Sequence, residues 1–160
     1  IKDPSKEDIN KALKNLNRVN TSDKGENSSV IKKDLQEIMQ TSFGVFRRED
    51  NMKNGIKIID EIRARAENLH LADKSSKFNT ARIEALELLN LLEVAEATAI
   101  SANERKESRG AHSRDDFPER DDENWLKHSI YFKGSKEITK RDVNFRPKIV
   151  QAFQPFARTY

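Results

Sequence analysis

The sequence predicts a mainly α-helical fold: a three-helix up-down bundle, spectrin-repeat-like, with an extra N-terminal helix and a small C-terminal β-hairpin that leads into an irregular tail. Two patterns support this prediction. Apolar residues recur at intervals of three or four through most of residues 1–110, as on one face of a helix. The later segments "WLKHSIYF" and "EITKRDVNF" are instead rich in β-branched and aromatic residues. We therefore expect a helical bundle over residues 1–110 and, packed on it, a charged loop, hairpin and tail over residues 111–160.

The first two helices are separated by a polar linker at residues 20–29. The first helix is expected to begin at Asp3-Pro4, an N-cap residue followed by proline in the first turn, and to continue to about Arg18. Gly44 is expected to end the second. The apolar faces are formed by Ile9, Ala12, Leu13 and Leu16 in the first helix and by Val30, Ile31, Leu35, Ile38 and Met39 in the second.

The third and fourth helices carry the strongest helical periodicity. Asp50 or Asn51 is expected to cap the third, whose apolar face consists of Met52, Ile56, Ile59, Ile62 and Ala66, with Leu69 at its end. The fourth is expected to run from a cap at Asn79 or Thr80 to about Ser108, with Gly110 as terminator. It is apolar around more than half of its circumference, which is typical of a helix contacted on several sides.

A β-hairpin and a tail complete the chain. The segments "WLKHSIYF" and "EITKRDVNF" are separated by Lys133-Gly134-Ser135-Lys136, a turn sequence that indicates a hairpin. A two-stranded hairpin alone is marginally stable in water, so it should lean on the bundle or on a neighbouring domain. The tail is interrupted by two prolines, and its aromatic residues Phe153, Phe156 and Tyr160 are expected to anchor it over a surface.

The composition excludes several classes of protein. The chain has no cysteine, which rules out disulfides, thiol catalysis and zinc–thiolate sites within it. No apolar run is long enough to span a membrane, and no signal-peptide pattern is present, so we expect a soluble chain. Because it starts at Ile1 within a polar run, we also expect it to be part of a longer protein.

The charges are unevenly distributed, although the net charge is only +3. Residues 107–125 contain seven carboxylates, three arginines and one histidine, and a strongly basic segment follows them. Arginine and carboxylate groups pair bidentately. We interpret the stretch as a charge network that orders the loop after the fourth helix and docks it against other protein. The candidate residues are Arg105, Glu107, Arg109, His112, Arg114, Asp115, Asp116, Arg120, Asp121 and Asp122. Because exposed single pairs contribute only about 0–1 kcal/mol, the network should be partly covered by a partner or another domain.

Two chemical alternatives use the same stretch. In a catalytic site, His112 would be a general base oriented by Asp115 or Asp116, but no nucleophile is marked nearby. In a metal site, His112 would act with Asp115, Asp116, Asp121 or Asp122, but there is no His-x-x-x-His pair and no calcium-loop pattern. We therefore predict no catalytic residue and no metal ligand.

Phosphate and nucleic acid are two alternative ligands. Neither Gly-x-Gly-x-x-Gly nor a P-loop occurs, so no cofactor-binding residue is predicted. Nucleic acid would use the basic tail and stack bases on Phe145, Phe153, Phe156 and Tyr160. Packing anchors explain these aromatic residues as well, and basic charge alone is non-specific, so we expect no nucleic acid partner.

Three segments of the sequence resemble a known family. These are "FGVFRREDNM" at residues 43–52, residues 73–132 with their "ESRGAHSR" and "RDDENW" elements, and the ending "PFARTY". They are similar to the C-terminal region of the succinate dehydrogenase flavoprotein family. Fumarate reductase flavoproteins and L-aspartate oxidases share the "ESRG" element, whereas "DFPERDDENWLKH" and the Arg-Thr-Tyr terminus resemble succinate dehydrogenase more.

The resemblance implies a parent enzyme that oxidises succinate to fumarate with covalently bound FAD and passes electrons to an iron–sulfur subunit and on to quinone. The family's flavin-binding and substrate-binding residues lie upstream of the matched region, so none is carried over to this sequence. The region is implied to be a helical docking domain, inactive by itself and without cofactor, that contacts the upstream flavin domain and the iron–sulfur subunit. The parent is expected to lie peripherally on the inner side of an energy-transducing membrane, held there by partner subunits without inserting directly.

Overall fold

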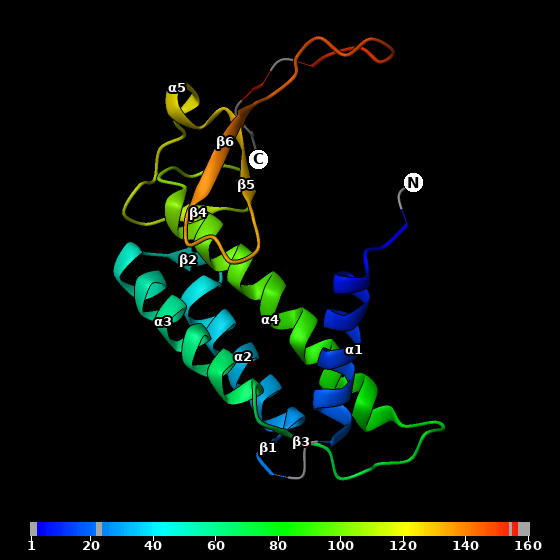
Figure 1. Cartoon of the computed structure of the whole chain (residues 1–160). Coiled ribbons are helices and arrows are strands. Elements are labelled where there is room, and N and C mark those ends of the chain that lie inside the picture. Colours follow the sequence, from blue (N-terminus) through cyan, green and yellow to red (C-terminus); the bar gives the residue numbers. More distant parts are fainter. Residues whose placement is uncertain (1–2, 22–23, 154, 157–160) are drawn as a thin grey trace.

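A computed structural model describes residues 3–21, 24–153 and 155–156 (Figure 1). The helices are α1 (Lys6–Thr21), α2 (Ser28–Phe43), α3 (Glu49–Ala66), α4 (Thr80–Glu104) and the single turn α5 (Asp122–Trp125). The strands are β1 (Glu26–Asn27), β2 (Phe46–Arg47), β3 (Leu69–His70), β4 (Ser113–Arg114), β5 (Lys127–Tyr131) and β6 (Ile138–Asp142). The predicted mainly helical fold with a C-terminal antiparallel hairpin is confirmed.

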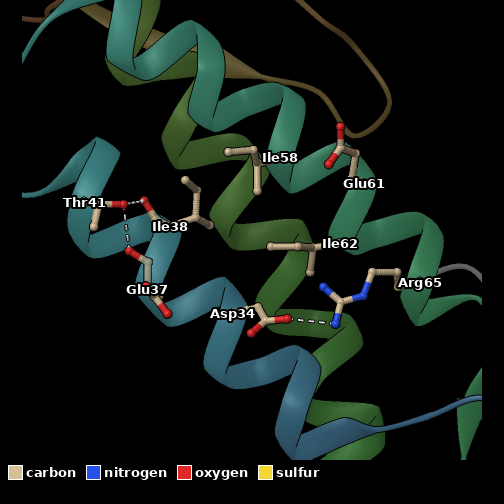
Figure 2. Close-up of a pocket in the computed structure, with 8 residues that line it drawn as sticks. All are labelled: Asp34, Glu37, Ile38, Thr41, Ile58, Glu61, Ile62 and Arg65. Carbon is tan, nitrogen blue, oxygen red and sulfur yellow. Dashed lines mark hydrogen bonds and ion pairs between the residues drawn. The ribbon is translucent and has the colours of Figure 1, made fainter.

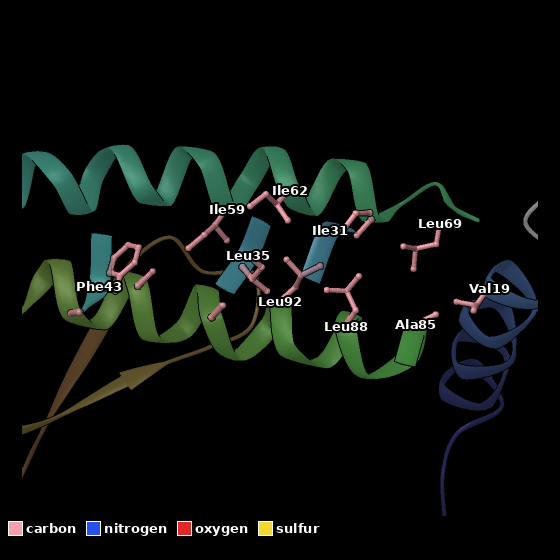
Figure 3. Packing of buried hydrophobic residues seen from close by; sticks show 14 of the residues in the cluster. Val19, Ile31, Leu35, Phe43, Ile59, Ile62, Leu69, Ala85, Leu88 and Leu92 are labelled. Atoms are coloured by element: carbon pink, nitrogen blue, oxygen red, sulfur yellow. The ribbon is translucent and has the colours of Figure 1, made fainter. Parts of the chain in front are cut away.

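The core lies between α2, α3 and α4, which pack against one another in pairs. Figure 3 shows Leu35, Ile59, Ile62 and Leu92 meeting at its centre. Helix α1 contributes far less: Val19 in its last turn is buried, whereas its expected apolar residues Ile9, Leu13 and Leu16 are 45%, 50% and 36% exposed. The three-helix bundle is therefore largely complete without α1.

Two short parallel strand pairs, which the sequence did not predict, lie at opposite ends of the bundle (Figure 1). At one end β1 pairs with β3, with Glu26 opposite Leu69. At the other end β2 pairs with β4, with Phe46 opposite Ser113. The second pair joins the α2–α3 connection to the charged loop, so that loop is held at a fixed place on the bundle.

The first helix begins at a cap other than the one expected, and the second has a cap for which no prediction was made. Ser5, and not Asp3, caps α1, because its hydroxyl accepts from the Asp8 N–H at 3.1 Å and donates to the Asp8 carboxylate at 2.6 Å. Asn27 caps α2 through a 2.9 Å bond from the Ser29 N–H. The expected linker at residues 20–29 therefore ends in the strand β1 and in the cap of α2.

The fourth helix is capped by Asn79, one of the two expected residues, which accepts from the Arg82 N–H at 2.7 Å. It ends at Glu104, earlier than the expected Ser108, because the backbone of Arg105 is extended. Gly110 does not terminate the helix. It has a φ of 59° in the turn where Arg109 and His112 exchange backbone hydrogen bonds.

The hairpin leans on the bundle, as expected, and is held at both ends. At its base two cations contact the Trp125 ring, with the Arg105 guanidinium 5.1 Å and the Lys140 ammonium 3.4 Å from the ring centroid. At its tip, Lys136 pairs with Asp60 of α3 and Glu96 of α4. Its position therefore depends on charged contacts as well as on apolar ones.

The tail does not anchor as expected. Phe153 and Phe156 are 79% and 81% exposed, and Tyr160 lies outside the described residues. The carbonyl of Phe156 accepts a 3.1 Å hydrogen bond from Arg120, which links the tail to the charged loop. None of the helices within the described residues is long and apolar enough to cross a membrane.

Candidate docking site around the charged loop

Arg114 lies at the centre of the charged loop, and its side chain is fully buried. Its Nη1 donates to three carbonyls at the end of α4, those of Ala102, Asn103 and Arg105, at 3.3, 3.0 and 3.1 Å. A helix end leaves such carbonyls without intrahelical partners and favours a cation, so Arg114 acts as the C-cap of α4 from a distance.

Asp116 caps the N-terminus of α3. It accepts two hydrogen bonds from Arg114, at 2.7 and 2.8 Å, and one from the Glu49 N–H in the first turn of α3 at 2.9 Å. The residue before α3, Arg48, makes no side-chain cap, and the expected caps Asp50 and Asn51 lie inside the helix. The hydrogen bond from Arg114 lowers the pKa of Asp116 far below its usual range.

Glu107 is a second buried centre, with a fully enclosed side chain. It accepts from Arg105 at 2.5 Å, from Arg109 at 2.8 and 2.9 Å, and from the Asp121 N–H at 2.9 Å. Burial raises the pKa of Glu107, but these hydrogen bonds outweigh burial and the net pKa is lowered. The carboxylate therefore stays ionised and ties the end of α4 to the start of α5.

Asp122 extends this cluster towards solvent. It pairs with Arg120 at 2.5 and 2.7 Å and with Arg109 at 2.6 Å, and these bonds lower the pKa of Asp122 to about 2. Asp121 instead caps α5, accepting from the Asn124 N–H at 2.9 Å. The exposed residues of the network therefore also stabilise the local structure, by binding neighbouring arginines and by capping α5.

His112 is not paired with a carboxylate. Its Nδ1 lies 2.7 Å from Arg47 Nη1 and its Nε2 lies 3.1 Å from the Arg105 carbonyl. Because arginine can only donate and a carbonyl can only accept, the proton is assigned to Nε2 of a neutral ring. Burial lowers the pKa of His112, and the charges of Arg47, Arg114 and Arg105 lower it further. Arg47 was not among the predicted residues, although it lies within the family-like segment "FGVFRREDNM".

Most of the predicted candidates therefore gather around two centres, the Arg114–Asp116 pair and the Glu107 carboxylate, and Asp115 belongs to neither. Asp115 is exposed and contributes its backbone N–H to the Arg47 carbonyl, at 2.9 Å. The catalytic alternative, His112 with Asp115 or Asp116, has no supporting contact among the described residues. The described part of the chain also contains no group of three potential metal ligands, which leaves the metal alternative without support.

A third charge cluster, at the hairpin tip, was not predicted. Arg63 pairs with Glu93 at 2.8 Å and with Glu96 at 2.5 Å, and Lys136 reaches the same Glu96 at 3.0 Å and Asp60 at 2.7 Å. Lys133 joins Glu93 at 3.1 Å. These residues lie far apart in the sequence, so no local pattern brings them together.

A shallow groove between α2 and α3 is a further surface feature (Figure 2). Its volume is about 310 Å³, and Ile38, Ile58 and Ile62 lie along it. Asp34 pairs with Arg65 across the groove at 2.7 Å, and Glu37 and Glu61 lie exposed on its rim.

Taken together, the ionised side chains of the charged loop bind one another and cap helix ends. Such a network fixes geometry, but it offers no free nucleophile or base with convergent partners. Chemically, the loop is suited to holding α3, α4 and the hairpin in one arrangement.

Residues 32–160 match the family model of the fumarate reductase flavoprotein C-terminal region, which is more than half of the chain. The chain belongs to the succinate dehydrogenase/fumarate reductase flavoprotein family, as a C-terminal domain. The resemblance drawn from the "ESRGAHSR" and "RDDENW" elements is thus confirmed at the level of the family. The "ESRGAHSR" element contains Glu107, Arg109 and Arg114. A segment that carries the resemblance therefore also supplies part of the charge network.

Members of both branches of this family are similar to the chain. It is 46% identical to the succinate dehydrogenase flavoprotein subunit of Coxiella burnetii over 152 residues, 95% of the chain and 26% of that subunit. It is 36% identical to the fumarate reductase flavoprotein subunit of Haemophilus influenzae over 84% of the chain and 22% of that subunit. The chain spans about a quarter of the length of these curated relatives.

Several solved structures share the fold. A quinol fumarate reductase structure from E. coli superposes with a TM-score of 0.79 at 30% identity, covering 96% of this chain and 27% of that one. The adenylylsulfate reductase of Archaeoglobus fulgidus superposes with a TM-score of 0.60 at 26% identity over 75% of this chain. The fold is therefore shared by reductases whose names indicate different substrates.

Proposed function

We propose that this chain is the structural and docking domain of a succinate dehydrogenase flavoprotein and carries no catalytic residue of its own. The parent enzyme would oxidise succinate to fumarate with FAD and pass electrons to an iron–sulfur subunit and then to quinone. The upstream flavin domain and the iron–sulfur subunit would be its partners. Partner subunits would hold the parent peripherally on the inner side of an energy-transducing membrane.

One observation supports the docking role most directly. The buried charges of the loop are fully occupied. Arg114 binds carbonyls at the end of α4 and the carboxylate of Asp116, which caps α3, and Glu107 joins the end of α4 to the start of α5. Because these charges bind one another within the domain, they keep its elements in a fixed arrangement. The domain therefore presents a preorganised surface to its neighbours. Catalysis would instead need a group with a free, convergent site.

The residues present do not fit FAD. The sequence has five glycines, none in a Gly-x-Gly-x-x-Gly arrangement that would cradle a pyrophosphate. The arginines of the charged loop, which could bind phosphate, are paired with carboxylates or helix carbonyls. We therefore assign FAD to the rest of the parent and no reaction step to these residues.

A succinate-dependent dye-reduction assay tests the lack of turnover. The purified 160-residue chain should reduce no dye with succinate present, with or without added FAD. The full-length flavoprotein serves as the positive control. Succinate-dependent reduction by the chain alone would overturn this part of the proposal.

Substitution of Arg109 by alanine in the full-length flavoprotein tests the docking role of the charged loop. The variant should assemble less well with the iron–sulfur subunit or hold its C-terminal domain more loosely, because Glu107 and Asp122 lose a shared partner. Co-purification of the subunit and resistance to limited proteolysis are the measurements. Arg141→Ala, at an exposed position of β6, is the control. Wild-type assembly and resistance in the Arg109 variant would count against the proposal.

Succinate dehydrogenase is preferred over its relatives as the parent. The 46% identity to the Coxiella succinate dehydrogenase subunit exceeds the 36% identity to the Haemophilus fumarate reductase subunit. A fumarate reductase or an L-aspartate oxidase remains the alternative parent. Steady-state rates of the full-length flavoprotein with succinate, fumarate and L-aspartate distinguish the three.

An autonomous nucleic-acid-binding module is the alternative from another class. It would use the basic tail, where Phe153 and Phe156 are exposed. A salt-dependent mobility shift with arbitrary oligonucleotides would favour this alternative. We expect no shift at low salt.

A further inference from the structure

A small pocket lies between the end of α4 and the base of the hairpin, and its volume is about 230 Å³. Three of the residues that line it, Arg105, Arg109 and Lys127, are cations. No carboxylate of the described part of the chain belongs to the lining. A pocket whose charged groups all have one sign attracts a ligand of the opposite sign. The lining therefore favours an anion.

The ion pairs around this pocket leave an excess of positive charge. Arg105 and Arg109 share the carboxylate of Glu107, and Arg109 shares Asp122 with Arg120. Three guanidinium groups are thus balanced by only two carboxylates. One positive charge of this group has no counter-ion within it.

The neutral imidazole of His112, which also lines the pocket, lies in the same positive field. Arg47 donates to its Nδ1 at 2.7 Å and has no carboxylate partner among the described residues. Burial lowers the pKa of His112, and the charges of Arg47, Arg114 and Arg105 lower it further. An anion bound in the pocket would compensate these charges.

Two cations of the lining have hydrogen-bond donors to spare. Arg109 binds its partners through Nε and Nη2, whereas its Nη1 donates no hydrogen bond within the described residues. Lys127 donates one of its three ammonium N–H groups to Asp142, at 2.6 Å. The existing ion pairs therefore leave donors with which an anion can be bound.

The buried centres of the charged loop offer no such donors. Glu107 and Arg114 are 0% and 1% exposed, and their polar atoms are satisfied within the chain. The expectation that this network needs a partner for its burial is therefore wrong, because the chain's own residues already bury it. A ligand can be received only at the edge of the network, where the side chains of Arg109 and Lys127 are 26% and 36% exposed.

The rest of the lining limits the kind of anion. Trp125, Leu126 and Val143 are apolar, and an inorganic oxyanion would leave them without a contact. Pockets for drug-sized ligands have volumes of about 300–1,000 Å³, so this smaller one cannot enclose a nucleotide. A carboxylate accepts hydrogen bonds from arginine and lysine together. We propose that this pocket binds a small organic carboxylate with an apolar body, a role that does not depend on the proposed docking function.

The fluorescence of Trp125 reports on the pocket, because the sequence contains only one tryptophan. Cyclohexanecarboxylate is the probe, since it combines a carboxylate with an apolar ring that does not absorb where tryptophan does. Cyclohexanecarboxamide has nearly the same shape without the charge, and sulfate has charge without an apolar body. These two compounds are the matched controls. Titration calorimetry measures binding independently of the emission.

We expect saturable binding of cyclohexanecarboxylate that weakens as salt is added, and binding of the amide and of sulfate that is about tenfold or more weaker. Equal binding of the amide would overturn the role of the cations. Equal binding of sulfate would indicate a site for inorganic anions and overturn the ligand class. The absence of saturable binding in both methods would overturn the site itself.

Two substitutions test the location of the site. Lys127→Met removes a partly exposed cation and should weaken binding by about fivefold, with Lys148→Met in the exposed tail as control. Val143→Asp places a carboxylate in the lining and should weaken binding by about tenfold or more. Its control is Val150→Asp, at a tail position that is 67% exposed. Unchanged melting temperatures verify folding, and an affinity of Lys127→Met equal to that of its control would overturn the assigned location.

The full-length flavoprotein distinguishes a free carboxylate from a carboxylate of the parent itself. If the ligand is a free molecule, the full-length protein should bind cyclohexanecarboxylate as tightly as the 160-residue chain does. Binding that is present in the chain and lost in the full-length protein would mean that a carboxylate of the parent fills the pocket. That result would overturn our assignment.

Discussion

Arg114 and Asp116 are two residues apart, bind each other through two hydrogen bonds of 2.7 and 2.8 Å, and cap two different helices. Arg114 satisfies carbonyls at the end of α4, and Asp116 accepts from the first turn of α3. One ion pair thereby compensates the partial charges of two helix ends that lie side by side. The pair is a structural joint, and its energetics can be measured in the isolated chain.

Substitution of Arg114 by methionine should destabilise the chain by about 3 kcal/mol, because it leaves Asp116 unpaired and the α4 carbonyls unsatisfied. Urea denaturation followed by circular dichroism gives the free energy of unfolding. Arg141→Met at the exposed position of β6 is the matched control and should change stability by less than about 0.5 kcal/mol. A loss at Arg114 no larger than that of the control would show that the caps contribute nothing.

Acid should weaken the fold through the same loop. Asp116 and Asp122 have lowered pKa values, that of Asp122 being about 2, whereas unfolded aspartate titrates near 3.9. As pH falls below about 4, the unfolded chain binds protons that the folded chain does not, so the free energy of unfolding falls towards about pH 2. The contribution is fully present above the unfolded pKa.

The matched variant for this prediction is Asp116→Asn. It should be less stable near neutral pH, and its free energy of unfolding should fall less steeply between about pH 4 and pH 2, because one of the two carboxylates no longer titrates. Urea unfolding at a series of pH values provides the comparison. Identical acid slopes for the variant and the wild-type chain would exclude Asp116 as a source of the effect.

His112 should produce a separate, milder pH dependence. Its pKa is lowered in the folded chain, so between its ordinary value near 6.5 and the folded value only the unfolded chain takes up a proton. Stability is therefore complete above about pH 6.5 and declines as pH falls below it. His112→Gln keeps a donor towards the Arg105 carbonyl and should abolish this part of the decline. NMR titration of the His112 ring would contradict the prediction if its pKa lay at or above the ordinary value.

The sequence predicted most of the helices because their apolar residues follow a period that burial requires, as at Ile31, Leu35, Ile59 and Ile62. It also marked most of the charged loop, since Glu107, Arg109 and Arg114 cluster within eight positions. It failed where a partner lies far away in sequence. Arg47 pairs with His112 across 65 residues, and Asp116 replaces a local cap of α3 across 67.

The same physical reason explains the incorrect end of α4. Gly110 is a good helix terminator by conformation, but the helix stops at Glu104, and the guanidinium of Arg114 returns to bind the α4 carbonyls. Local propensity gives the range in which a helix can end, and tertiary hydrogen bonds select the residue. The tail aromatics Phe153 and Phe156 were predicted to be anchors but are exposed. The apolar character of a residue does not indicate which surface covers it.

Lys136 should control the attachment of the hairpin tip. Lys136→Met removes the ammonium from Asp60 and Glu96 and leaves the largely buried Glu96 paired with Arg63 alone. Because Lys136 is 58% exposed, the global cost should be small, about 0.5 kcal/mol. Amide hydrogen exchange in β5 and β6 should quicken by about twofold as the tip opens locally. Lys148→Met, in the exposed tail, is the control, and equal exchange in both variants would contradict the prediction.

Gly55 should tolerate no side chain, although it lies in the middle of α3, where alanine normally favours a helix by about 1 kcal/mol. A Cβ at this position would lie 2.6 Å from the Ser42 Cβ and 2.7 Å from Phe43 Cε2, because α2 and α3 approach closely here. Gly55→Ala should therefore lower the free energy of unfolding by about 1–3 kcal/mol, as overpacking does. Asn54→Ala, at the exposed neighbouring position, is the control and should be neutral or slightly stabilising. A stabilised Gly55→Ala chain in thermal unfolding would show that α2 and α3 separate without cost.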